Sequence, residues 1–224
     1  MNLDSSHAHI VYGDSEAFFK QVTAWIDTHH GPQEDGVTFF SYNKRVLKIG
    51  DVRDIQHPVN LRGAEGKAKH VIIRAQLIVL AAQNALLKTL EDPQSDTRFY
   101  INVPSGSYII PTILSRTAQH TIEGGNKDVG VAKEFISLHY AGRSALLEQY
   151  KFENEQGKMV YDKEQISVFV SQLIAYMLQL AHAKKVITAD DIDSIRKLQT
   201  YILDPSSSTK QIVESIAVLV PVIK

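Results

Sequence analysis

The chain has 224 residues, of which 44% are hydrophobic, so it can bury a real core in one large or two small domains. Its formal net charge of −1 excludes a strong whole-molecule attraction to nucleic acid or anionic lipid. The absence of cysteine excludes disulfides, thiolate nucleophiles and thiolate zinc sites. Without a basic leader or an apolar run of roughly 20 residues, the sequence predicts a soluble, cytoplasmic protein with no membrane partner.

In the first half of the chain, short β-rich runs alternate with helical patterns, which predicts an α/β fold on a parallel sheet. The runs are mostly apolar without clean alternation, as expected for strands that helices cover on both faces. The expected strands are 8–12, 37–40, 70–73, 98–103 and 119–122, and the clearest helices are 15–30 and 77–92. Two glycines among polar residues at 123–128 indicate a linker, so the first domain is expected at 1–123.

The second half contains no convincing strand, and we expect an all-α domain over residues 124–224. Asp162 and Gln165 are placed like a capping box before a long run of apolar residues at helical spacing. The expected helices are 131–150 and three that begin after Asp162, Thr188 and Ser208. The polar segment 151–159 is expected to be a connecting loop.

A nucleotide site would need a glycine loop and a lysine after the first strand, because closely spaced N–H groups and a cation must surround the phosphates. The segment "GDSEAFFK" (13–20) has one glycine, carboxylates at Asp14 and Glu16, and a lysine only at Lys20, inside the expected helix. The carboxylates would repel a triphosphate. We therefore expect no nucleotide cofactor.

The sequence also lacks residues placed to bind a metal ion. Magnesium chemistry would need a carboxylate pair at the end of the third strand, because a hard cation is held by oxygen ligands. In this sequence Ile73 and Arg74 occupy those positions. The nine histidines show no convincing ligand spacing, so we expect no metal site.

One basic concentration stands out. Residues 43–74 hold eight Lys or Arg and three Asp or Glu, a local net charge of +5. A solvated face and a surface that contacts phosphates are equally good interpretations. The candidate DNA contacts on the second interpretation are Arg62, Lys67 and Lys69.

Four segments, in order and at matching spacing over residues 7–122, resemble the AAA+ subunits of bacterial clamp loaders. They are "HAHIVYG" (7–13), "IGDVRDI" (49–55), "NALLKTLEDP" (84–93, opened by Asn84) and "PTILSR" (111–116). The resemblance implies a P-loop-type AAA+ parallel sheet domain followed by an all-α, collar-like oligomerisation domain.

The same resemblance implies that Ser115, Arg116 and Thr117 form the serine–arginine motif of this family, with Arg116 as an arginine finger that reaches the ATP of a neighbouring subunit. A guanidinium suits this task because it stays charged and can meet the charge on a transferred phosphoryl group. Thr117 stands where the family usually has cysteine. The alternative is that Arg116 forms a surface ion pair.

Several family features are missing together: the phosphate loop, the acidic pair, the polar sensor residues near 102–107 and the cysteine-rich zinc insertion. This pattern resembles a reduced form of the non-catalytic delta-prime branch of the DNA polymerase III clamp-loader family. It implies no intrinsic ATPase or polymerase activity, and a hetero-oligomer with other clamp-loader subunits that acts on a sliding clamp and primed DNA. Two alternatives stay open, an ATPase-dead AAA+ adaptor and an autonomous AAA+ ATPase with an unusual site.

Overall fold

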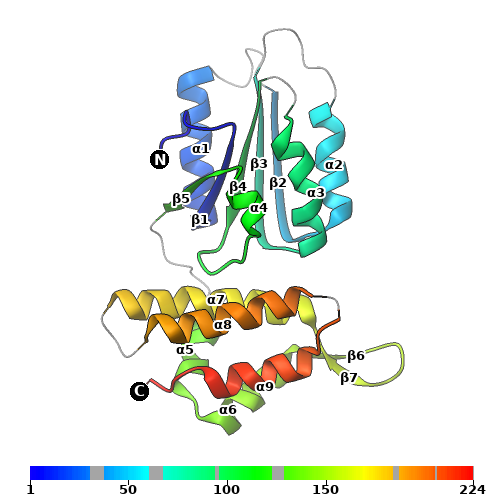
Figure 1. Ribbon diagram of the computed structural model, residues 1–224, viewed down its shortest axis with the longest axis vertical. Helices are drawn as coiled ribbons and strands as arrows, with labels where there is room; N and C mark the ends of the chain where they lie inside the picture. Colours follow the sequence, from blue (N-terminus) through cyan, green and yellow to red (C-terminus); the bar gives the residue numbers. More distant parts are fainter. Residues whose placement is uncertain are drawn as a thin grey trace. The chain divides into compact units, whose positions relative to one another are not determined.

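The computed structural model forms two compact units, Met1–Gly125 and Asn126–Lys224, each with its own buried core (Figure 1). The structure describes residues 1–30, 38–60, 68–93, 96–122, 129–183, 187–204 and 206–223. The linker predicted at 123–128 lies outside these ranges. Within them, no helix combines the length and the apolar character that a membrane span requires.

The N-terminal unit is built on a five-stranded sheet in the order β2-β3-β4-β1-β5, and every pairing in it is parallel, as predicted. The strands are β1 (Ala8–Gly13), β2 (Thr38–Leu47), β3 (Lys69–Ile78), β4 (Thr97–Val103) and β5 (Ala118–Ile122). β2 and β3 extend well beyond the predicted 37–40 and 70–73. They pair with each other from Thr38 to Leu47, so backbone hydrogen bonds keep the polar residues 43–45 in the strand. A search for apolar runs cannot detect this polar part of a strand.

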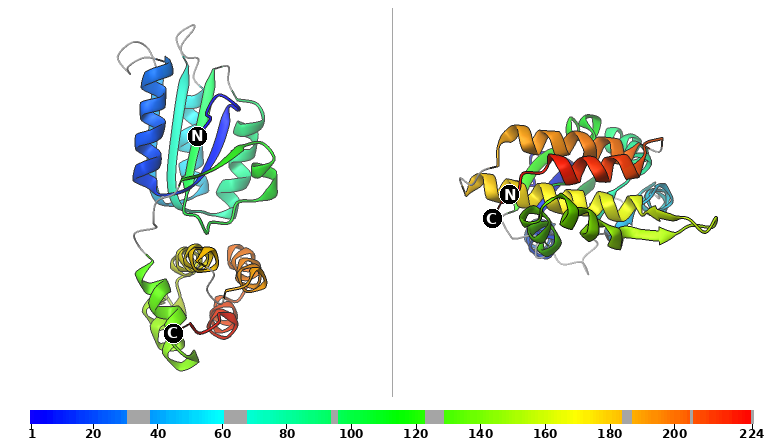
Figure 2. Two further views of the ribbon diagram at one scale, coloured as in Figure 1. Left: turned by 90° about the vertical axis from the view of Figure 1, so that its left-hand side faces the viewer. Right: turned by 90° about the horizontal axis from the view of Figure 1, so that it is seen from below.

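Helices cover both faces of this sheet (Figure 2, left). α1 (Ser15–His30) packs on one face, and α2 (Ile49–Asn60), α3 (Leu80–Glu91) and the short α4 (Pro111–Leu114) pack on the other. α1 buries Phe18, Val22 and Ile26, which share one stripe because they are spaced by four residues. The helix predicted at 77–92 starts only at Leu80, because Leu77 and Ile78 are the last residues of β3 and Val79 is the N-cap of the helix.

A stack of aromatic and histidine rings lies between α1 and the sheet. The His9 ring stacks on Tyr100 with centroids 5.6 Å apart, and its Nδ1 lies 3.0 Å from Nε2 of His120. His70 Nδ1 hydrogen-bonds the Tyr100 hydroxyl at 3.1 Å. Burial lowers the pKa of His9 and the pKa of His70 to about 4 each, so both rings are neutral in the folded protein at pH 7.

Acid is therefore expected to destabilise the N-terminal unit. The unfolded chain binds protons on these histidines near pH 6.5, whereas the folded chain binds them only near pH 4. The free energy of unfolding should thus fall as the pH drops from about 6.5 to about 4, by on the order of 2 to 3 kcal/mol for each ring. Urea titrations followed by the fluorescence of Trp25, the single tryptophan, measure this.

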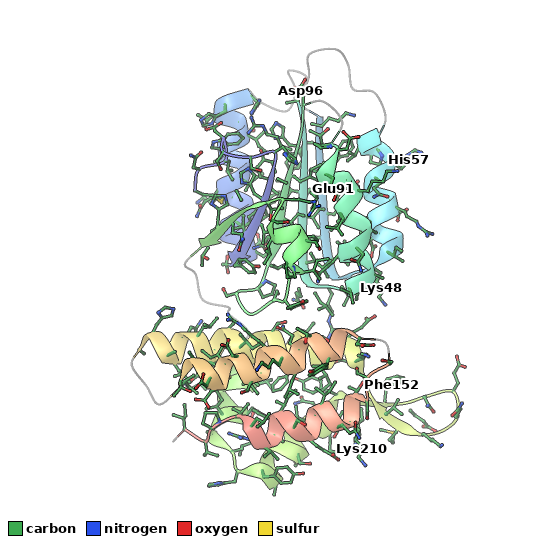
Figure 3. The ribbon with its side chains drawn as sticks, viewed as in Figure 1. Lys48, His57, Glu91, Asp96, Phe152 and Lys210 are labelled. Carbon is green, nitrogen blue, oxygen red and sulfur yellow. The ribbon has the colours of Figure 1, made fainter. Side chains whose placement is uncertain are left out.

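His70→Phe should weaken this pH dependence, because it removes one of the two buried titrating rings. His57→Gln is the control, since His57 lies exposed on α2 (labelled in Figure 3) and should leave the dependence intact. A stability that stays constant between pH 7 and 4.5 would contradict the prediction.

The C-terminal unit is mainly helical. Its helices are α5 (Gly130–Ser137), α6 (Tyr140–Leu147), α7 (Lys163–His182), α8 (Ala189–Leu203) and α9 (Thr209–Leu219), and a short 3₁₀ turn, η2 (Glu148–Tyr150), follows α6. α7 is buried along most of its length and forms the centre of this core. The three predicted helix starts are confirmed, since the side chains of Asp162, Thr188 and Ser208 all accept backbone N–H groups of the helix that follows.

Two details of this unit differ from the prediction. The single helix expected at 131–150 is broken into α5 and α6, because Leu138 and His139 adopt extended backbone angles. The expected loop 151–159 instead contributes to an antiparallel hairpin of β6 (Lys151–Glu153) and β7 (Met159–Tyr161). Its turn is closed by Asn154, whose Oδ1 accepts the backbone N–H groups of residues 156 and 158, so a polar sequence without alternation still forms a hairpin.

Candidate functional site

Arg116 lies just after α4, where three contacts hold its guanidinium. Nη2 is 2.5 Å from the carboxylate oxygen Oε1 of Glu91, at the end of α3 (Glu91 is labelled in Figure 3). Nη1 donates to the Thr112 carbonyl at 2.7 Å and to the Ser115 hydroxyl at 3.1 Å. The structure therefore joins the two motifs "NALLKTLEDP" and "PTILSR" through one ion pair, and we call these four residues the arginine site.

The other two residues of the predicted serine–arginine motif have local roles here. The Ser115 hydroxyl donates to the Thr112 carbonyl at 3.0 Å, and the Thr117 hydroxyl donates to the Ile113 carbonyl at 3.0 Å. Both bonds add a donor to carbonyls at the end of the short α4, where the Thr112 carbonyl also accepts from Arg116 Nη1 and the Ile113 carbonyl also accepts the Arg116 backbone N–H. Ser115 also contacts Arg116, whereas the Thr117 hydroxyl bond supports the backbone.

Gln83 anchors α4 to α3, and sequence reasoning missed it. Its side chain is fully buried; Oε1 accepts the Ile110 N–H at 2.8 Å, and Nε2 donates to the Ile78 and Tyr108 carbonyls at 2.9 and 3.1 Å. The sequence feature that could have revealed this role is that Gln83 is a polar residue on the apolar face of a helix. Buried polar groups need hydrogen-bond partners. Asn84, which opens the quoted motif, is exposed.

At the end of β1, where a phosphate loop would follow the first strand, charged side chains contact the backbone and one another. Asp14 Oδ1 accepts the backbone N–H groups of Glu16 and Ala17 at 3.0 and 2.7 Å, so a carboxylate already caps the N-terminus of α1. Arg74 of β3 pairs with Glu16 at 3.0 Å, and its guanidinium carbon lies 4.3 Å from the ring centre of Phe19.

Asn102, at the start of the segment predicted to lack sensor residues, is turned into the same end of β1. Its buried amide donates to the Val11 carbonyl at 3.0 Å and to the Gly13 carbonyl at 3.3 Å. This amide therefore fixes the backbone where β1 leaves the sheet.

In the basic segment 43–74, Lys69 does not lie on the DNA-contacting surface that one interpretation of the sequence predicted. This side chain is only 4% exposed, and its ammonium donates to the Val59 carbonyl at 3.0 Å, at the end of α2. Lys69 is therefore withdrawn as a DNA contact, because a buried ammonium cannot meet a phosphate backbone. The other two candidates, Arg62 and Lys67, lie outside the described residues, so their contact with DNA stays a prediction.

Across the described ranges, no three His, Cys, Asp or Glu side chains gather as ligands that could hold a metal ion. The buried His9 bonds to the half-buried His120 and to the Ser6 carbonyl, and the buried His70 bonds to the Tyr100 hydroxyl.

The N-terminal unit is thus an α/β domain with a parallel sheet and helices on both faces, and a mainly helical unit follows it. A family model described as DNA polymerase III, delta subunit, matches residues 7–125, more than half of the chain. The protein therefore belongs to the DNA polymerase III delta subunit family.

Two curated relatives are each named DNA polymerase III subunit delta', so this member is delta-prime-like. The Haemophilus influenzae protein is 32% identical over 88 residues, which cover 39% of this chain and 27% of that one. The Escherichia coli K12 protein is 36% identical over 78 residues, or 34% of this chain and 23% of that one. The matched segment thus spans about a quarter of the length of these relatives.

Among solved structures, a DNA polymerase III gamma subunit-related protein from Thermotoga maritima aligns over 95% of this chain and 67% of its own, with 18% identity and a TM-score of 0.43. A mutant RuvB from the same organism aligns over 88% of this chain and 63% of its own, with 13% identity and a TM-score of 0.33.

Proposed function

We propose that this protein is a non-catalytic, delta-prime-like subunit of a bacterial clamp loader, and that it supplies Arg116 in trans to ATP bound by a neighbouring motor subunit. Family membership over the N-terminal unit supports the assignment. The main support for a non-catalytic role is the arrangement of side chains at the end of β1. There Asp14, Glu16 and Arg74 take the positions that phosphates and a metal would need.

The geometry at this end of β1 argues against nucleotide hydrolysis by the chain itself. The N–H groups of a helix N-terminus bind phosphate when they are available, but here the Asp14 carboxylate accepts two of them. A triphosphate would also meet the negative charge of Glu16, and Arg74 stands where a carboxylate would hold magnesium. This combination favours a degenerate site over the alternative of an autonomous ATPase.

The C-terminal unit is proposed as the collar that holds the assembly of motor subunits, sliding clamp and primed DNA together. Four large apolar side chains are exposed near the start of α6 and the end of α9, namely Tyr140, Val218, Leu219 and Val222. Arg143 bonds the carbonyls of Ala217, Val220 and Pro221, so these helix ends lie side by side. Stable interfaces need such apolar area in addition to a single finger contact.

Arg116 can serve as the finger because its side chain is partly exposed and its ion pair with Glu91 is weak. The side chains of Arg116 and Glu91 are 34% and 49% exposed, and ion pairs between exposed groups contribute only about 0–1 kcal/mol. A phosphate carries more charge than a carboxylate and is bound bidentately by a guanidinium. The surface ion pair of the alternative interpretation therefore does not prevent Arg116 from binding a phosphate.

The proposal predicts that Arg116→Ala lowers the ATPase and clamp-loading rates of the reconstituted complex while assembly is preserved. A trans arginine can be worth about 10³-fold at one ATP site, but a loader has several sites, so a severalfold loss overall is expected. Arg116→Lys should restore little, because lysine keeps the charge and loses the planar fork. Steady-state ATPase with primed DNA and clamp, at matched assembly, measures both variants.

Arg196→Ala is the matched control, since Arg196 forms an exposed ion pair with Asp193 on α8 and belongs to the other unit. Rates that remain at the wild-type level in both Arg116 variants would refute the finger and favour an ATPase-dead adaptor.

A further inference from the structure

We infer that Glu91 is a positioning residue for Arg116, and that α3 is the support on which the finger is mounted. The inference rests on the proposed function and concerns how the finger is held before a neighbouring ATP is bound. Its starting point is the contact between Glu91 Oε1 and Arg116 Nη2, which joins the last residue of α3 to the segment after α4.

The arginine site holds the guanidinium at two of its nitrogens. The Thr112 carbonyl and the Ser115 hydroxyl bind Nη1, and Glu91 binds Nη2. Among the described residues, these contacts occupy three of the five N–H donors of an arginine. A phosphate can therefore be engaged without dismantling the whole arrangement.

Holding the side chain in advance matters because arginine is long and flexible. A free arginine side chain loses several rotatable degrees of freedom when it is fixed against a ligand, which weakens the interaction. Contacts already present in the unbound subunit reduce that loss, as preorganisation does in other binding sites. Of the three acceptors, only Glu91 belongs to a different helix, so it ties the guanidinium directly to α3.

α3 is rigid enough to act as this support. It buries Ala82, Leu86 and Leu90 against the sheet, and its first turn is joined to the segment before α4 by Gln83. The same helix therefore holds α4 at its start, through Gln83, and the guanidinium at its end, through Glu91. This arrangement gives a physical reason for the two motifs to occur in the same chain.

The test compares Glu91→Ala and Glu91→Gln, each in the wild-type and in the Arg116→Ala background, in the reconstituted complex with primed DNA and clamp. Glu91→Ala is expected to lower the steady-state kcat two- to fivefold, because the finger loses its contact with α3. Glu91→Gln should keep at least half of the rate, since its amide oxygen still accepts from Nη2. In the Arg116→Ala background, Glu91→Ala should have no further effect.

Asp27→Ala is the matched control, because Asp27 is an exposed carboxylate of the same unit on α1. The urea midpoint from Trp25 fluorescence should be the same for Glu91→Ala and wild type, which separates positioning from a loss of stability. If Arg116→Ala lowers the rate but Glu91→Ala leaves it unchanged or raises it, the positioning role is wrong and the finger stands. If Arg116→Ala itself changes nothing, the proposed function fails.

Discussion

Arg143→Met is expected to destabilise the C-terminal unit by about 3–5 kcal/mol, because a buried guanidinium there holds several chain segments together. Arg143 is only 2% exposed. All five of its N–H donors are used, and every acceptor is a backbone carbonyl: Phe135, Ile136, Ala217, Val220 and Pro221. Methionine fills a similar volume but removes one donor from each of these carbonyls. Those of Phe135 and Ile136 also accept a backbone N–H, from Leu138 and Ile223.

The charge on Arg143 is compensated by helix ends and not by a carboxylate among these contacts. Four of the five acceptors lie in the last turns of α5 and α9 or directly after α9, where the carbonyls carry the negative end of the helix dipole. Burial lowers the pKa of Arg143, but an arginine remains charged at neutral pH. The guanidinium thus serves as a common cap for two helices.

Thermal unfolding followed by far-UV circular dichroism, together with hydrogen exchange of α5 and α9, measures the effect. Arg143→Lys should recover only part of the loss, because an ammonium has three donors where five are used. Arg196→Met is the control: this residue is 51% exposed, and its loss should cost less than about 0.5 kcal/mol. A cost below about 1 kcal/mol for Arg143→Met would contradict the assigned role.

Gly13→Ala is expected to destabilise the N-terminal unit by about 3 kcal/mol or more. Gly13 ends β1 with φ +128°, a conformation that residues with a Cβ rarely adopt. A Cβ at this position would lie 2.3 Å from the carbonyl oxygen of Ile122 in β5. The clash is with backbone, so relief requires the edge strand β5 to move away from β1, with loss of their pairing.

Urea unfolding followed by Trp25 fluorescence measures this change, since Trp25 belongs to the same unit. Gly50→Ala is the matched control, because Gly50 lies in the first turn of α2 and a Cβ added there would meet nothing within 4 Å. That substitution should leave stability unchanged or raise it by about 0.5–1 kcal/mol, as alanine favours a helix. Equal midpoints for Gly13→Ala and wild type would show that β5 adapts without cost.

Much of the fold follows from local sequence patterns. The five parallel strands, the long α1 and the three capped helix starts were predicted because each depends on residues that are neighbours along the chain. The predictions of secondary structure were wrong where strand pairing or turn geometry gives a polar segment a structure that its composition does not indicate. The polar end of β2 is extended by β3, and the polar segment near Asn154 closes a hairpin.

The candidate site was predicted less completely. Arg116 and the missing phosphate loop could be read from motifs, because those features are defined by residue type and spacing. Lys69 was assigned to the surface from its charge, yet it is buried against the end of α2. Gln83 and Glu91 were not assigned roles, because their partners lie in segments distant in the sequence.

By itself, the sequence determined the class of fold and the order of the five parallel strands, since these rest on apolar runs and turn residues, and its motifs resemble the family that the comparison then showed. Only the tertiary structure decided which polar groups meet. Arg74 pairs with Glu16, Arg143 joins two helix ends, and Glu91 reaches Arg116. The physical reason is that hydrogen bonds and ion pairs act over about 3 Å, and a chain brings residues that are far apart in sequence to that distance only by folding.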